Sequence, residues 1–191
     1  EHGSGQWNTV SLLLSNGVRL KINGMMGSSA LFGIIAAVTI PAFVQYSRRS
    51  KAAEAQLGLQ KLSAASIAYY STVRVDQNGT KQTPQFPKSA PLSPGNPAQH
   101  MCPDGGSRKF RATADTWAHE TWKALSFSPK PSWYAYEYIS SGAGPGSSFT
   151  ARAYGDLDCD GILSTFEMRA QIDATGNVVK DGRVYINQEV E

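Results

Sequence analysis

The stretch from Gly33 to Arg49, GIIAAVTIPAFVQYSRR, combines an apolar run, an internal proline and a closing pair of arginines. No charged side chain occurs in residues 22–47, and a helix needs only about 20 residues to cross a bilayer core. Because only residues 30–44 are strongly apolar, a buried core helix is the alternative to a membrane span. Pro41 predicts a kink or local loosening of the helix, and Arg48-Arg49 are typical of a membrane boundary.

The helical pattern continues beyond the two arginines, but its composition changes. Residues 47–74 are rich in Ala, Leu, Lys and Gln, which favour helix. Apolar positions from Leu59 to Val73 fall on one stripe, and charged and amide side chains occupy the opposite side. Asn78-Gly79 is a typical end signal. We therefore expect one long helix over residues 24–76, with a transmembrane first half and a second half that packs on a soluble domain.

The rest of the chain divides into a connection and a sheet. Residues 77–132 hold most of the ten prolines and predict a loop that contains a short helix. Residues 133–191 alternate apolar and polar side chains in runs separated by Gly- and Asp-rich turns, with no helical crossover, which predicts an antiparallel β-meander. Residues 1–23 are an N-terminal extension, either a hairpin turning at Asn16-Gly17 or the end of an upstream domain. The predicted fold class is α+β.

Composition excludes several classes of function. The net charge is +3 and the basic side chains are scattered, which is too little for a nucleic-acid surface, so no nucleic-acid partner is expected. The three histidines are dispersed, and neither a nucleophile elbow nor a phosphate-binding loop occurs. We therefore expect a protein that is not an enzyme.

The two cysteines, Cys102 and Cys159, both lie in polar, turn-rich sequence. Only one intramolecular disulfide can form between them. It would close a long loop and stabilise the fold by about 4 kcal/mol in the chain-entropy model. Two unrelated thiols are the alternative. The disulfide is the prediction, because a membrane-flanked domain is expected in an oxidising compartment.

An acidic loop, GDLDCDGILSTFE at residues 155–167, fits the calcium-loop pattern D-x-D-x-D-G-x5-E. Alternate carboxylates would converge on a hard cation, and Gly161 would permit the sharp turn. The candidate ligands are Asp156, Asp158, Asp160, the Ile162 carbonyl, Ser164 and Glu167. Calcium affinity in the range of about 10⁻⁴ to 10⁻³ M is expected for such a site. Because the flanking sequences predict strands rather than helices, an Asp-rich turn that binds nothing is the alternative.

Six aromatic residues in the second half of the chain allow two interpretations: Trp117, Trp122, Trp133, Tyr134, Tyr136 and Tyr138. They could form an exposed platform for a glycan or surface ligand. They could also fill the core between helix and sheet, which the alternation in WYAYEYIS favours because it turns half of its side chains inward.

The segment from Gly33 to about Tyr70 resembles the N-terminal helix of type IV pilins and type II secretion pseudopilins. The residues that carry the resemblance and would form the assembly helix are Gly33, Ile34, Ile35, Pro41, Phe43 and Tyr46. The resemblance implies a structural filament or pseudopilus subunit that packs through this helix against other pilin or pseudopilin subunits. It also implies an inner-membrane anchor before assembly, a periplasmic or extracellular C-terminal domain, and calcium sites in sheet loops.

The resemblance has one clear departure. Aligned on Pro41, the glycine that precedes the prepilin-peptidase cut falls on Arg19, and the acidic residue that begins the mature helix falls on Gly24. Two interpretations therefore stay open. The chain is an assembling subunit, or it is a membrane-anchored, pilin-like calcium-binding or surface-binding domain of a larger protein that forms no filaments.

Overall fold

The computed structural model divides the chain into two units, Glu1–Tyr46 and Ser47–Glu191, and each is described by itself. Within the long helix α1, side chains are described from Thr39 onward, apart from Pro41. The residues that the structure describes are 9–13, 19–23, 27–113, 115–129, 131–181 and 183–189.

The first unit contains a two-stranded antiparallel hairpin and the beginning of α1. Strand β1 (Thr9–Leu13) pairs with β2 (Arg19–Asn23) in a register that sets Thr9 opposite Asn23 and Leu13 opposite Arg19. The turn predicted at Asn16-Gly17 lies outside the described residues, so only the pairing of the two strands is established.

Helix α1 (Gly27–Ser71) is continuous through Pro41 and ends earlier than the sequence predicted. The expected end signal at Asn78-Gly79 lies in the following loop instead. Arg74 caps the C-terminal end of α1. Its Nη1 donates to the carbonyl oxygen of Tyr69 (2.9 Å), and its guanidinium stacks 3.7 Å from the Tyr69 ring centroid. A cation at this position satisfies a free carbonyl and complements the negative end of the helix dipole.

The predicted membrane span in the first half of α1 is not confirmed. Among the residues that the structure describes, no helix combines the length and the apolar character needed to cross a bilayer.

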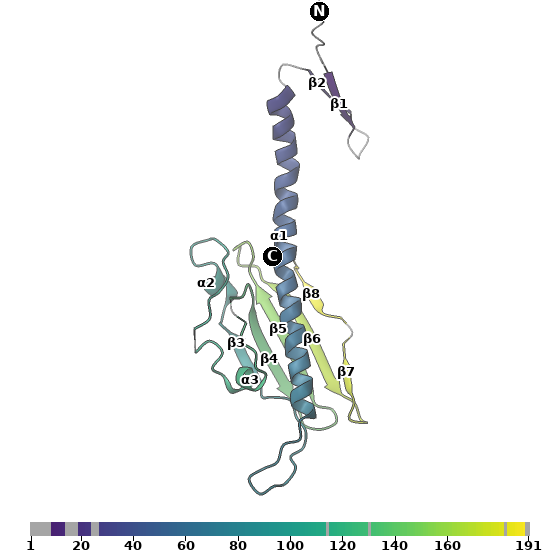
Figure 1. Ribbon diagram of the computed structural model, residues 1–191, viewed down its shortest axis with the longest axis vertical. Coiled ribbons are helices and arrows are strands. Elements are labelled where there is room, and N and C mark those ends of the chain that lie inside the picture. The colour runs from purple at the N-terminus through teal and green to yellow at the C-terminus, as the bar shows by residue number, and fades with distance from the viewer. Residues whose placement is uncertain are drawn as a thin grey trace, which may run out of the picture. The chain divides into compact units, whose positions relative to one another are not determined.

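The second unit is built on a six-stranded antiparallel sheet, which confirms the α+β class (Figure 1). The strand order is β3-β4-β5-β6-β7, and β8 also pairs with β6. The bounds are β3 (Ala90–Ser93), β4 (Ala135–Ser141), β5 (Ser148–Gly155), β6 (Ser164–Ile172), β7 (Val178–Lys180) and β8 (Tyr185–Asn187). Two short helices, α2 (Pro97–Met101) and α3 (Glu120–Ala124), lie in the predicted proline-rich connection. The same connection supplies strand β3.

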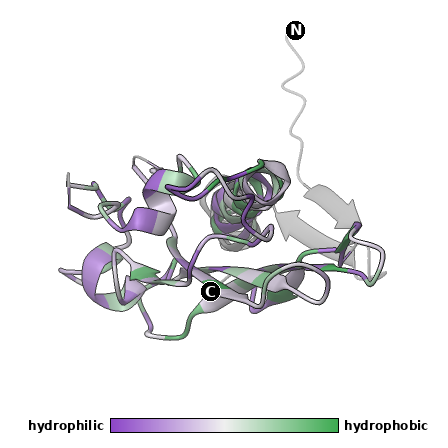
Figure 2. Cartoon of the chain, turned by 90° about the horizontal axis from the view of Figure 1, so that it is seen from below, coloured by the Kyte–Doolittle hydropathy of each residue, from purple (hydrophilic) through white to green (hydrophobic). Residues whose placement is uncertain are grey.

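The core lies between one face of this sheet and the part of α1 from Ala52 onward (Figures 1 and 2). Along β5 the side chains alternate, so that Phe149, Ala151 and Ala153 are buried and their neighbours are half-buried. Helix and sheet approach closely at Gly58, where an added Cβ would lie 2.3 Å from Tyr136 Oη. A small residue is therefore required on this face of the helix.

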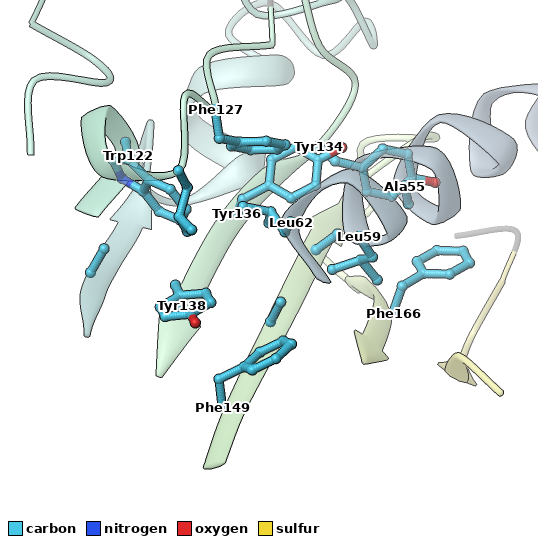
Figure 3. Packing of buried hydrophobic residues seen from close by; sticks show 14 of the residues in the cluster. Ala55, Leu59, Leu62, Trp122, Phe127, Tyr134, Tyr136, Tyr138, Phe149 and Phe166 are labelled. Carbon is cyan, nitrogen blue, oxygen red and sulfur yellow. The ribbon is translucent and has the colours of Figure 1, made fainter. Parts of the chain in front are cut away.

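The aromatic residues confirm the core interpretation, and the exposed-platform interpretation is wrong for five of the six. Trp122, Tyr134, Tyr136 and Tyr138 are all buried (Figure 3). Trp117 is buried as well. Their rings pack mainly edge to face, as for Trp117 on Trp122 (centroids 5.5 Å apart), an arrangement that aromatic quadrupoles favour.

Trp133 is the exception among the six, because it is half-buried at the margin of the core. The Lys51 ammonium lies 4.0 Å from its ring centroid, a cation–π distance. Partial burial, and then repulsion from Arg48, lower the pKa of Lys51. One face of this indole is thus occupied by a side chain of α1.

The buried tyrosines make the fold sensitive to alkaline pH. Burial raises the pKa of Tyr134, Tyr136 and Tyr138 above the ordinary value of about 10. Unfolded chains release these protons near pH 10 while the folded state keeps them, so stability is intact below that pH and falls as pH rises above it. Urea unfolding between pH 8 and 11 should show a decline that Tyr138→Phe makes shallower. A free energy of unfolding that stays constant up to pH 11 would contradict this assignment.

Candidate functional site

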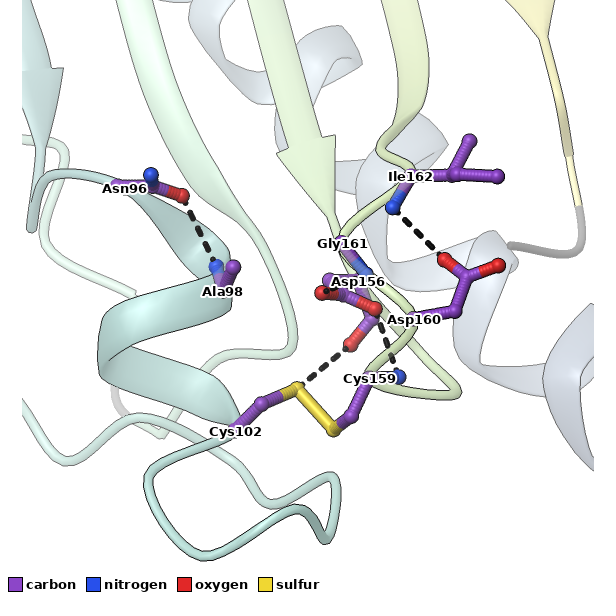
Figure 4. The surroundings of a disulfide bond; sticks show 8 residues. All are labelled: Asn96, Ala98, Cys102, Asp156, Cys159, Asp160, Gly161 and Ile162. Atoms are coloured by element: carbon purple, nitrogen blue, oxygen red, sulfur yellow. Dashed lines mark hydrogen bonds between the residues drawn. A yellow bond between two sulfur atoms is a disulfide. The ribbon is translucent and has the colours of Figure 1, made fainter.

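The disulfide between Cys102 and Cys159 confirms the pairing expected from the sequence. It joins the C-terminal end of α2 to the loop between β5 and β6, across 57 residues of sequence, with the two Cα atoms 5.6 Å apart. The Cys102 sulfur also contacts the carbonyl oxygen of Asp156 at 3.5 Å (Figure 4). The proline-rich connection is therefore pinned directly to the acidic loop.

Aspartate side chains fold the acidic loop back on itself. The Asp156 carboxylate is buried and accepts the backbone N–H groups of Cys159 (2.7 Å) and Gly161 (3.2 Å). Asp160 Oδ1 accepts the N–H of Ile162 at 2.7 Å (Figure 4). Gly161 has φ of 89°, as the predicted sharp turn requires. These hydrogen bonds fold the loop tightly around the buried Asp156 carboxylate, whereas Asp160 is exposed.

Three of the predicted ligands are brought together. Asp156, Asp158 and Asp160 each offer a carboxylate oxygen, and these oxygens lie within 4.8 Å of one another. Asp158 Oδ2 pairs with Arg48 Nη1 at 3.0 Å, whereas its Oδ1 is buried with no hydrogen-bond partner among the described residues. Arg48 thus pairs with one of the three carboxylates, and a buried acceptor without a partner is unfavourable.

Among the other predicted ligands, the Glu167 carboxylate does not join this cluster. Glu167 forms ion pairs with Arg152 and Arg169, both at 2.5 Å. Ser164 is buried and donates its hydroxyl to the Gly155 carbonyl (3.2 Å), and the N–H of Ile162 is bonded to Asp160. The helix-flanked form of the calcium loop is therefore absent from this part of the structure. In a strand each residue advances by about 3.3 Å, so β6 carries Glu167 away from the loop that precedes it.

Arg48 has a contact that the sequence did not predict. We expected it to mark a membrane surface, which stays a prediction, and its guanidinium also binds the acidic loop through Asp158. The two residues are far apart in sequence, and no local pattern signals their contact. Only the docking of α1 on the sheet brings them together.

The predicted assembly helix exposes apolar side chains where they are described. Ile40, Phe43 and Tyr46 are 63%, 71% and 73% exposed. Val44 is also exposed, and with Ile40 and Phe43 it occupies the three- and four-residue spacing of one helix face. The backbone at Gly33, Ile34, Ile35 and Pro41 is helical, and the side chains of these four residues lie outside the described part.

Comparisons of the chain with protein-family models, with curated proteins and with solved structures gave no match.

The disulfide makes a testable contribution to stability. Replacing both cysteines by serine should lower the free energy of unfolding by about 2–5 kcal/mol, because the unfolded chain is no longer cross-linked over a long loop. Urea unfolding of the double variant beside the oxidised wild type measures the difference. Equal stability of the two proteins would show that the cross-link does not hold the connection to the sheet.

Proposed function

We propose that this chain is a non-enzymatic structural subunit of a pilus-like filament or pseudopilus, which assembles through α1. The observation that carries the proposal is the exposed apolar face at Ile40, Phe43 and Val44, on the same continuous helix whose later part packs on the sheet. Large apolar side chains gathered on one exposed face favour association, because their burial removes apolar area from water. Copies of the same helix are the partners that the resemblance to pilins implies.

Two further observations support this proposal. The order of a long helix followed by an antiparallel sheet agrees with the pilin-like arrangement expected from the sequence. The disulfide fits a location outside the cytoplasm, where cystines persist. The alternative is a pilin-like domain of a larger protein that forms no filaments, and it predicts no self-association through α1.

Self-association can be measured on the purified chain by sedimentation velocity over a range of concentrations. Phe43→Ser should weaken it at least about tenfold, because burying a phenylalanine contributes about 1.5–3 kcal/mol and each 1.4 kcal/mol is a factor of ten. Val179→Ser is the matched control, since Val179 is an exposed apolar residue of β7. Association that is unchanged in Phe43→Ser, or equally weakened in Val179→Ser, would contradict assembly through this face.

A second candidate function is cation binding at the acidic loop. The observation that favours it is the convergence of Asp156, Asp158 and Asp160, with Asp158 Oδ1 buried and without a hydrogen-bond partner in the described part of the chain. Carboxylate oxygens suit Ca²⁺, which takes six to eight oxygen ligands and would complete its shell with backbone carbonyls and water. Arg48 already balances one of the three carboxylates, so weak binding is expected.

Thermal unfolding with added calcium tests this candidate. If Kd lies near 10⁻³ M, 10 mM CaCl2 should stabilise the chain by about 1.4 kcal/mol and raise its melting temperature. Asp160→Asn should abolish the increase, because the amide can still accept the Ile162 N–H but carries no charge. Asp173→Asn is the control, since Asp173 makes similar hydrogen bonds in a different turn. Wild type that melts at the same temperature with and without calcium would exclude the site.

A further inference from the structure

The loop that follows α1 forms an ordered turn at Asp76-Gln77-Asn78-Gly79-Thr80 (Figure 1). The Asp76 N–H donates to the Thr80 carbonyl (2.9 Å), and the Gly79 N–H donates to the Asp76 carbonyl (3.0 Å). Asp76 Oδ1 accepts the N–H groups of Asn78 (2.8 Å) and Thr80 (2.9 Å). Gly79 has φ of 79°, and an added Cβ there would meet no atom within 4 Å. Asn78 therefore lies at the tip of a defined, open turn.

The sequence at this tip, Asn78-Gly79-Thr80, is the acceptor pattern N-x-[ST] for N-glycosylation. No other asparagine of the sequence has Ser or Thr two positions later. Three-residue patterns of this kind arise by chance, so accessibility and compartment decide whether this one can be used.

The exposure of this turn favours N-glycosylation at Asn78. Residues 77–80 are all exposed. Within the described chain, neither the Asn78 carboxamide nor the Thr80 hydroxyl makes a hydrogen bond, so both polar groups can be bound by an enzyme.

The expected location of the chain is also compatible with N-glycosylation. The Cys102–Cys159 disulfide is typical of proteins outside the cytoplasm, where N-glycosylation acceptors are found.

The position of Asn78 is also compatible with cation binding at the acidic loop. At 1.5 Å of helix rise per residue, the end of α1 at Ser71 is roughly 35 Å from Arg48, which pairs with the acidic loop. A group attached at Asn78 would leave that loop accessible.

We propose that Asn78 is an N-glycosylation site. The donor is a lipid-linked diphosphate oligosaccharide, and a membrane-bound oligosaccharyltransferase catalyses the transfer. Asn78 Nδ2 attacks the anomeric carbon of the first sugar, the bond from that carbon to the diphosphate oxygen breaks, and the lipid diphosphate leaves. The amide nitrogen gives up one proton, which the leaving diphosphate takes up, and no electrons are exchanged with an oxidant or reductant. The Thr80 hydroxyl is the group that the enzyme recognises.

The attached glycan has a physical role at this position. Val73 and Val75 expose apolar side chains in the same loop. A bulky, hydrated oligosaccharide at Asn78 would keep these side chains from hydrophobic contact with other copies of the chain. The loop would then stay soluble while a different part of the chain, in α1, mediates assembly.

Mass spectrometry of the chain isolated from the cells that produce it tests the proposal. Trypsin cuts after Arg74 and Lys81 and releases the heptapeptide VDQNGTK, which contains the whole acceptor pattern. Most of this peptide should carry the added mass of an oligosaccharide, and its fragment ions should place that mass on Asn78. Recovery of the heptapeptide without any added mass would overturn the proposal.

Matched variants test whether the Thr80 hydroxyl is required for glycosylation of Asn78. Thr80→Val keeps the shape of the side chain but lacks the hydroxyl, so occupancy should fall to zero, whereas Thr80→Ser should retain the glycan. Asn177→Gln changes an exposed turn asparagine outside the pattern and should leave the heptapeptide modified. Modification that persists in Thr80→Val would contradict recognition of the pattern. None of these results depends on self-association, so this proposal and filament assembly can fail separately.

Discussion

Close contact between α1 and the aromatic face of the sheet is the constraint on which the second unit depends. Ala52, Ala55 and Gly58 present small groups on the helix, and Gly58 lies against the ring of Tyr136 with no space for a methyl group. The short distance lets the large rings of the sheet reach the helix surface and exclude water. A single sheet face cannot bury itself, so the helix is a structural half of this core.

The same contact determines what the rest of the helix can do. Docking commits one side of α1 to the sheet and places Arg48 beside Asp158, so that an arginine which resembles a membrane marker stabilises a loop. The disulfide holds that loop from the other side, through Asp156 and Cys159. Apolar side chains such as Phe43, in the earlier part of α1, are exposed. The sheet thus packs against the later part of the helix.

Sequence periodicity was sufficient for the elements with a strong repeat. The buried positions Leu59 and Leu62 of the helical stripe and the alternation in β4 to β6 were predicted in this way, whereas Val73, expected on the same stripe, lies beyond α1 and is exposed. The pairing of Cys102 with Cys159 was predicted because the chain has only two cysteines. Strand β3 was missed because Pro91 and its neighbours read as loop, although an edge strand tolerates a proline. The calcium pattern predicted which aspartates converge but not the fate of Glu167, because the pattern assumes a helix after the loop and β6 is a strand. The role of Arg48 depends on a contact distant in sequence, which a local pattern cannot contain.

The most direct test of the central claim, assembly through α1, is made on cells that produce the chain. Surface filaments are removed by shearing, membranes are fractionated, and the chain is quantified and its N-terminus sequenced in each fraction. Our account predicts recovery of the chain from the sheared filaments as a repeating subunit. Recovery from the membrane fraction alone, with none in the filaments, would contradict it and favour a pilin-like domain that does not assemble.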